Sequence, residues 1–197
     1  MLFGNNTATD NTAVQLLTDL GLEPVLSPRL QALTDTGSRY LRDLKMNLQT
    51  ALGAETLGAK DASLIGLAVA VNEGHEGLQN AFRTRALAAG ATEAEVAEVL
   101  ACTSLMNTNN VYYRFRHYLH DEFYDKAPAG IRMSIMASPV LGKELFELIS
   151  LAVSALNGCE LCVTSHEKAL VGHGTEKIRI HDAVRLSAVV KSLVVLL

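Results

Sequence analysis

Apolar residues recur at intervals of three and four positions along most of the chain, which is the spacing of helices with one buried face. Residues that favour helices (Ala, Leu, Glu, Lys and Arg) dominate the composition. The run LIGLAVAV, starting at Leu64, could be a short buried strand on periodicity alone, but its helical flanks argue against a strand. No other segment alternates convincingly between apolar and polar residues. The pattern therefore predicts an all-α fold.

Local signals predict where several helices begin and end. Ser27 followed by Pro28 places a capping hydroxyl before a proline at the first helical position. From there we expect one long helix to about Leu52, with apolar positions at Leu30, Leu33, Tyr40, Leu41, Leu44 and Leu48. Gly90 is expected to close a later helix, and Thr92-x-x-Glu95 has the pattern of a capping box at the start of the next.

An internal repeat organises the chain. Shifted by 84 residues, SLIGLAVAVNEGHEGLQNAFRTRALAAG from Ser63 aligns without a gap on ELISLAVSALNGCELCVTSHEKALVGHG from Glu147. Apolar residues match at 64–65 and 67–69 with 148–149 and 151–153, and two glycines of the first segment, at 74 and 90, match glycines of the second. We therefore expect a single domain over residues 1–197, built from two similar helical halves at about 61–104 and 145–188 that pack about a pseudo-twofold axis.

The repeat separates scaffold from chemistry, because the reactive residues do not recur. The second half has Glu147, Cys159, Cys162 and His166 where the first half has Ser63, His75, Leu78 and Phe82. This difference predicts one active centre per chain, in the second half.

The reactive residues follow the helix-breaking pair Asn157-Gly158. A helix starting near Gly158 would place Cys159 in its first turn, where free N–H groups and the helix dipole favour a thiolate. At about 100° per residue, Cys162 lies roughly 60° and His166 roughly 20° from Cys159 around the helix. The three side chains therefore share one face, with His166 one turn beyond Cys162.

This arrangement suits thiol redox chemistry. A thiolate can attack a peroxide O–O bond and become a sulfenic acid, and a second cysteine one turn away can condense with it to a disulfide. An external dithiol would then reduce the pair. Histidine can take or relay the thiol proton, since its unperturbed pKa is about 6.5.

Other interpretations of these residues remain open. Cys159, Cys162, His166 and His173 could be zinc ligands, although zinc sites usually draw their ligands from separate elements. Glu147 belongs to a polar stripe with Lys143, Ser150 and Ser154, which could be a solvated face or could line the site. Glu160 is more simply a first-turn acid favoured by the helix dipole.

The remaining cysteine and histidines are expected to be structural. Cys102 stands among apolar and small residues, as a core thiol would. His117 and His120 belong to a mixed-charge segment, RFRHYLHDEFYDK, that is typical of an exposed helix. His173 and His181 are expected at the surface or at helix caps.

Composition and charge narrow the function classes. Hydrophobic residues make up 49% and charged residues 19%, with a net charge of -4 and no basic tract, which argues against nucleic acid and anionic membranes as partners. No apolar run reaches membrane-spanning length, and MLFGNNTATDNTAVQ does not have the pattern of a signal peptide. We therefore expect a soluble, cytoplasmic protein.

The chain resembles the AhpD branch of the alkylhydroperoxidase and carboxymuconolactone decarboxylase superfamily. The segments that carry the resemblance are MNTNNVYYRFRHYL from Met106, GIRMSIMASP from Gly130 and FELISLAVSALNGCELCVTSHEKAL from Phe146. The last contains the signature E-x11-C-x2-C-x3-H, which is far more specific than a bare C-x-x-C. The resemblance covers about two thirds of the chain.

The resemblance implies a mechanism and partners. Cys162 would be the peroxidatic cysteine, Cys159 its disulfide partner, and His166 and Glu147 the proton relay. It also implies an antioxidant peroxidase, a homotrimer or other homo-oligomer, without bound metal, haem or flavin. Organic hydroperoxides would be the substrates, and a dihydrolipoyl group on a lipoylated acyltransferase, or a peroxiredoxin partner, would connect the enzyme to its electron supply.

One position departs from the family pattern. Well-studied members have a histidine immediately before the second cysteine, where this chain has Leu161. The departure affects the expected rate and pH profile more than the reaction class. Two other functions are weighed against the peroxidase: a carboxymuconolactone decarboxylase-like enzyme acting on a small cyclic acid, which would not need the dithiol, and a non-catalytic redox-sensing or zinc-binding protein.

Overall fold

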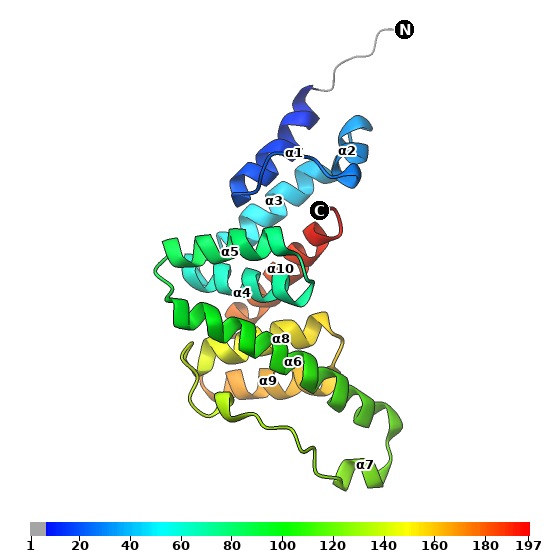
Figure 1. Ribbon diagram of the computed structural model, residues 1–197, viewed down its shortest axis with the longest axis vertical. Helices are drawn as coiled ribbons and strands as arrows, with labels where there is room; N and C mark the ends of the chain where they lie inside the picture. The colour runs from blue at the N-terminus through cyan, green and yellow to red at the C-terminus, as the bar shows by residue number, and fades with distance from the viewer. Residues whose placement is uncertain (1–6) are drawn as a thin grey trace.

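The computed structural model describes residues 7–197, and all its regular elements are helical (Figure 1). They are α1 (Thr7–Leu20), α2 (Pro28–Asp35), α3 (Tyr40–Leu52), α4 (Gly58–Asn72), α5 (Glu76–Ala88), α6 (Glu93–Leu119), α7 (Glu122–Lys126), η1 (Ser134–Met136), α8 (Lys143–Leu156), α9 (Glu160–Gly172) and α10 (Lys177–Val194). The predicted all-α fold is confirmed, and LIGLAVAV is part of α4. Residues 1–6 of the N-terminal segment MLFGNNTATDNTAVQ, which was not expected to be a signal peptide, lie outside this described range.

No helix among residues 7–197 combines the length and the apolar character that crossing a membrane requires. The C-terminal helix α10 packs against α3, α4 and α8. Its residues Leu186, Val190 and Leu193 are fully buried in the core. The apolar face of α10 is therefore covered within the subunit.

The expected long helix from Pro28 to about Leu52 is wrong, because the chain breaks into α2 and α3. Gly37 adopts a φ of 62°, a left-handed conformation that glycine accepts at little cost. The backbone N–H of Ser38 returns to the carbonyl of Leu33, which closes α2. The apolar period continues across the break because Leu30 of α2 and Leu41 of α3 enter the same small hydrophobic cluster. Periodicity alone cannot distinguish these two helices from one.

The predicted caps are confirmed. The Ser27 hydroxyl accepts from the Leu30 N–H at 3.1 Å, and Pro28 begins α2. Thr92 and Glu95 cap α6 reciprocally: the Thr92 hydroxyl accepts from the Glu95 N–H at 3.1 Å and the Glu95 carboxylate accepts from the Thr92 N–H at 2.7 Å. Gly90 follows the end of α5 with a φ of 92°.

The internal repeat extends to three helices in each half. Helices α5 and α6 begin at Glu76 and Glu93, and α9 and α10 begin 84 residues later, at Glu160 and Lys177. The repeated glycines have matching backbones, with φ of 70° at Gly74 and 67° at Gly158. The expectation of two similar halves is confirmed, with α4–α5–α6 in the first half and α8–α9–α10 in the second.

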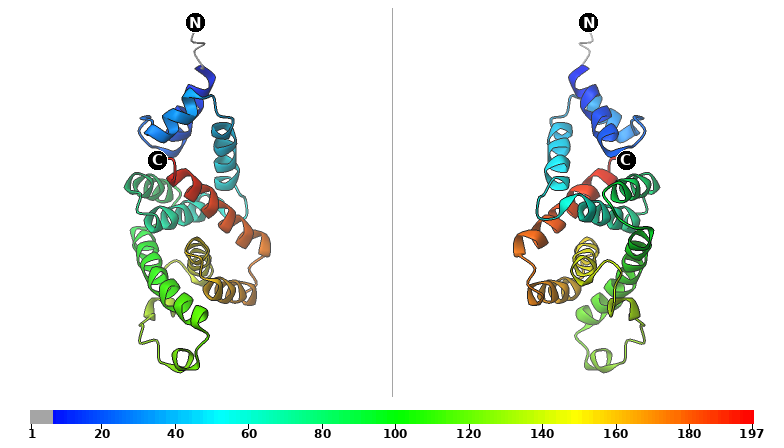
Figure 2. Two further views of the ribbon diagram at one scale, coloured as in Figure 1. Left: turned by 90° about the vertical axis from the view of Figure 1, so that its right-hand side faces the viewer. Right: turned by 90° about the vertical axis from the view of Figure 1, so that its left-hand side faces the viewer.

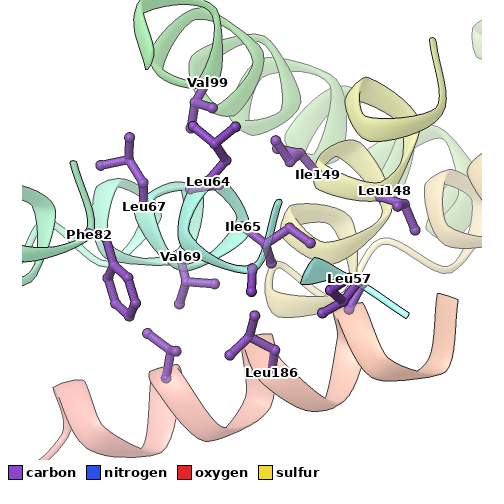
Figure 3. Packing of buried hydrophobic residues seen from close by; sticks show 14 of the residues in the cluster. Leu57, Leu64, Ile65, Leu67, Val69, Phe82, Val99, Leu148, Ile149 and Leu186 are labelled. Atoms are coloured by element: carbon purple, nitrogen blue, oxygen red, sulfur yellow. The ribbon is translucent and has the colours of Figure 1, made fainter. Parts of the chain in front are cut away.

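The third helix of each half crosses to the other half. Helix α10 packs on α4, α6 packs on α8, and α8 lies between α6 and α10 (Figure 2). The resulting core contains residues of both halves, including Leu64 and Ile65 from α4 beside Val99, Ile149 and Leu186 (Figure 3). The two halves therefore bury their apolar faces against each other.

Equivalent ion pairs join the first and third helices of each half with reversed charges. Lys60 of α4 pairs with Glu95 of α6 at 2.8 Å, and the equivalent Glu144 of α8 pairs with Arg179 of α10 at 3.2 Å. The pairing survives although the identities of both residues have changed. The repeat thus conserves an interaction that a residue-by-residue alignment would miss.

In the first half, an aromatic ring occupies the position that His166 has in the second half. Phe82 is fully buried, and a Cβ added at Gly66 would lie 2.5 Å from its ring. The equivalents of Gly66 and Phe82 in the second half are Ser150 and His166. The first half therefore has packing where the second has polar groups.

Gly66→Ala is expected to destabilise the fold by about 1–3 kcal/mol, because the added methyl group overlaps a ring enclosed on all sides. Gly172→Ala is the matched control, since it is also helical and its added Cβ meets no atom within 4 Å. The control should be neutral or slightly stabilising. Urea denaturation of both variants provides the measurement, and equal midpoints would contradict this account of the Gly66–Phe82 contact.

Candidate active site

The turn before α9 sets the positions of both cysteines. Gly158 has a φ of 67°, and the N–H of Cys159 donates to the carbonyl of Ser154 at 3.0 Å. Helix α9 begins at Glu160, so Cys159 is its N-cap and not a residue of its first turn as expected. Cys162 occupies the first turn instead. The free N–H groups and the positive end of the helix dipole therefore act most directly on Cys162.

A disulfide joins Cys159 and Cys162, whose Cα atoms are 5.3 Å apart. The two sulfurs differ in access, because Cys159 is fully buried whereas Cys162 is 6% exposed and lines a cavity. A molecule entering from solvent therefore meets Cys162 before Cys159.

His166 and Glu147 form a close pair between α9 and α8. The Nδ1 atom of His166 lies 2.6 Å from Oε2 of Glu147, and the two side chains are only 11% and 18% exposed. A carboxylate at Nδ1 fixes the orientation of the imidazole and directs Nε2 away from Glu147. Since His166 also lines the cavity with Cys162, its ring is placed for proton transfer there.

The polar stripe of α8 faces the protein interior. Ser150 and Ser154 are fully buried and Glu147 is mostly covered, so a solvated face explains only Lys143. Ser154 accepts a hydrogen bond from Asn110 of α6 at 2.8 Å. The stripe therefore connects α8 to α6.

An asparagine cluster, missed by the sequence analysis, holds the turn before Cys159. Asn157 donates to Asn110 at 3.0 Å, Asn72 donates back to Asn157 at 3.1 Å, and Arg114 donates to the Asn157 carbonyl. The signal was present in MNTNN, where polar residues interrupt a helix that otherwise packs on the core. Amides that are removed from solvent need hydrogen-bond partners, and these partly or fully buried amides bond to one another.

The cavity beside Cys162 has a volume of about 370 Å³. Its lining comes from α6, from the segment around η1 and from α9: Asn109, Tyr113, Met133, Met136, Leu161, Cys162, Ser165 and His166. Thioethers, an aromatic ring and Leu161 make much of this surface apolar. A larger cavity of about 430 Å³, bordered by α1, α3 and Arg85, has no cysteine or histidine in its lining.

Cys102 is a core thiol, as predicted. It is fully buried with its Sγ 3.4 Å from the Ser150 hydroxyl, and burial raises its pKa to about 12. The thiol therefore stays protonated at physiological pH, which makes it unreactive.

The other histidines expected to be structural lie at the surface or at helix ends, as predicted. The segment RFRHYLHDEFYDK is not one helix, however, because the chain breaks at His120, with a φ of 47°, between α6 and α7. His117 is partly exposed with Nε2 3.6 Å from the Glu160 carboxylate, His120 and His173 cap α6 and α9, and the His181 side chain is 66% exposed. Across residues 7–197, no three His, Cys, Asp or Glu side chains are grouped as metal ligands.

The fold and this site define the class of protein. A sequence model of the carboxymuconolactone decarboxylase family matches the chain twice, over residues 40–116 and 124–192. The first range covers α4, α5 and most of α6, and the second covers α8, α9 and most of α10. The chain belongs to the carboxymuconolactone decarboxylase family.

Within this family, the chain is similar to proteins named alkyl hydroperoxide reductase AhpD. The protein of Anaeromyxobacter dehalogenans (strain 2CP-C) is 40% identical over 168 residues, which cover 85% of this chain and 90% of the relative. That of Rhizorhabdus wittichii is 40% identical over 164 residues, covering 83% and 94%. That of Coxiella burnetii (strain RSA 493) is 37% identical over 167 residues, also covering 83% and 94%. The resemblance identified in the sequence is thereby confirmed.

Proposed function

We propose that this protein is an alkyl hydroperoxide reductase that uses Cys162 as peroxidatic cysteine, Cys159 as disulfide partner, and His166 with Glu147 as proton relay. The observation that carries the proposal is the cavity in which Cys162 and His166 meet, with Glu147 held on the far nitrogen of the imidazole. The names of the relatives support the reaction class. The absence of equivalent residues in the first half supports one such centre per chain.

The reaction proceeds in three balanced steps. The Cys162 thiolate attacks the terminal oxygen of the hydroperoxide, the O–O bond breaks, and a proton from His166 turns the departing alkoxide into an alcohol. The Cys159 sulfur then attacks the Cys162 sulfenic acid, and water leaves as the disulfide forms. An external dithiol reduces this disulfide by two thiol exchanges.

We propose a dihydrolipoyl group, carried by a lipoylated acyltransferase or by a system that includes a peroxiredoxin partner, as the electron source in the cytoplasm. The partial access to Cys162 supports exchange with a flexible dithiol, because only one sulfur of the disulfide has to be reached. No bound metal, haem or flavin is part of the proposal.

Leu161 lies at the cavity and is 45% exposed. A histidine at this position would add a second proton carrier. Because the position is leucine, His166 is the histidine of the cavity lining. We propose that the relay runs through His166 and Glu147 alone. Leucine instead adds apolar surface, which suits the alkyl part of an organic hydroperoxide.

The test is consumption of tert-butyl hydroperoxide by the wild-type protein with dihydrolipoamide as reductant. We expect turnover well above the uncatalysed rate. The monothiol glutathione should be much less effective, because it has no second thiol that could break the mixed disulfide by closing a ring. A wild-type rate equal to the background would overturn the proposal. Decarboxylation of a small cyclic lactone acid would then support the alternative that the family description offers.

We further propose that the protein assembles as a homo-oligomer, with a trimer as the expected state. The end of α6 and helix α7 project from the helical body (Figure 1) and expose Val111, Phe115, Tyr118, Leu119 and Phe123. An exposed apolar surface of this kind is typical of an interface. Light scattering coupled to size-exclusion chromatography should give three times the 21.2 kDa subunit mass, and a monomer would contradict the assignment.

A further inference from the structure

Asn109 lies in the wall of the cavity that contains Cys162 and His166, and none of the steps above uses it. It belongs to α6, one turn before Tyr113, and only 6% of its surface is exposed. A polar side chain so well covered ordinarily has partners for both its donor and its acceptor.

The orientation of the Asn109 amide is determined by Met133. Nδ2 of Asn109 donates to the Met133 sulfur at 3.3 Å. A thioether accepts hydrogen bonds but cannot donate, so the amide nitrogen and not the oxygen faces the sulfur. This contact sets the orientation of the amide, with Oδ1 turned away from the Met133 sulfur.

Oδ1 of Asn109 is buried and has no hydrogen-bond partner in the protein. A buried carbonyl oxygen without a donor is unfavourable, and a bound ligand that donates a hydrogen bond would remove that penalty. Met133, which covers this side of the cavity, has three rotatable bonds and can shift to admit such a donor.

The internal repeat shows that the scaffold does not require an amide at this position. The residue equivalent to Asn109 in the first half is Leu193, which is fully buried in the core. The chain therefore packs the same helix position with leucine where no reactive cysteine is present, and with asparagine beside Cys162.

We propose that Asn109 binds the hydroperoxide, with Oδ1 accepting the hydrogen bond from its O–H group. The inference rests on the proposed function. A hydroperoxide has one donor, on the terminal oxygen that the thiolate attacks, so this bond would hold that oxygen near Cys162. His166 remains available for the leaving alkoxide. The hydrogen stays on the transferred oxygen, and the sulfenic acid formed on Cys162 keeps its hydrogen bond to Asn109.

The test compares two reactions of Cys162 in the reduced protein: oxidation by tert-butyl hydroperoxide and alkylation by methyl iodide, which has no hydrogen-bond donor. Asn109→Leu should slow oxidation about tenfold, the effect of losing one neutral hydrogen bond to a reacting group, and leave alkylation unchanged. Asn109→Asp keeps an oxygen of the same reach and should recover most of the oxidation rate at a pH where Cys162 is ionised in both variants. Mass spectrometry at Cys162 follows both reactions.

Two outcomes would overturn the assignment of Asn109. Equal loss of both reactions would mean that leucine disturbs the site as a whole. If neither the oxidation rate nor the alkylation rate falls, Oδ1 binds a resident water or has no part in the reaction. A wild-type protein that is alkylated but not oxidised would instead overturn the proposed function itself, and the assignment with it.

Discussion

Cys162→Ser is expected to reduce hydroperoxide turnover to the uncatalysed rate, a loss on the order of 10⁴-fold or more, because a serine hydroxyl stays protonated where a thiol ionises. Cys162 is the sulfur that lines the cavity and lies in the first turn of α9, beside His166. The fold should survive, since serine has nearly the same volume. Peroxide consumption with dihydrolipoamide measures the effect, and circular dichroism checks the helices.

Cys159→Ser distinguishes the two cysteines. In this variant Cys162 should still react once with peroxide, and its sulfenic acid should persist because no thiol stands one turn away to resolve it. Dimedone added after one equivalent of tert-butyl hydroperoxide should label Cys162. Absence of this adduct would mean that Cys162 is not the cysteine that reacts with peroxide. Equal first-turnover rates for the two serine variants would remove the distinction between the two cysteines.

Cys102→Ser is the matched control for both. Its thiol is buried, its pKa is raised to about 12 by that burial, and it contacts Ser150 and the Phe146 carbonyl rather than the cavity. We expect unchanged peroxide turnover. A large loss in this variant would show that serine substitutions damage the core generally, and the Cys162 result would then need a different explanation.

His166→Gln is expected to lower the rate of Cys162 oxidation by about 10²–10⁴-fold, the range for removal of a general acid or base. The reason is geometric: His166 shares the cavity with Cys162, and glutamine can donate a hydrogen bond but cannot exchange a proton at neutral pH. In a second variant, His166→Ala, added imidazole should restore part of the rate of Cys162 oxidation, because the cavity is open to small molecules. Failure of any rescue, together with loss of helicity, would indicate a structural role.

Glu147→Gln separates orientation from proton transfer. Its carboxylate contacts His166 at 2.6 Å but is not part of the cavity lining, so it acts through the imidazole. We expect a loss of at least about 10–100-fold, the range found when a group that orients a metal-binding histidine is removed. Combining Glu147→Gln with His166→Gln should cost little more than His166→Gln alone. Additive losses would mean that Glu147 acts independently of His166.

The sequence by itself determined the class of fold and the segment that carries the chemistry. Helical periodicity, capping residues and positive-φ glycines are local signals, and they placed Gly90, Thr92 and the start of α2 correctly. The repeat at 84 residues predicted two similar halves because packing positions must be preserved wherever the same helices pack together. The C-x-x-C-x3-H spacing placed Cys162 and His166 one turn apart on a helix for the same local reason, although Cys159 precedes that helix as its N-cap.

Tertiary structure alone decided which polar residues face the cysteines. Glu147 is 19 residues from His166, and only the packing of α8 against α9 turns its stripe inward. The break at Gly37 also escaped the pattern, because Leu30 of α2 and Leu41 of α3 are buried in one cluster. Asn109 comes from α6, which crosses from the first half onto α8 and α9 of the second. The spacing of residues along the chain cannot predict this crossing, because it results from the two halves burying their apolar faces against each other.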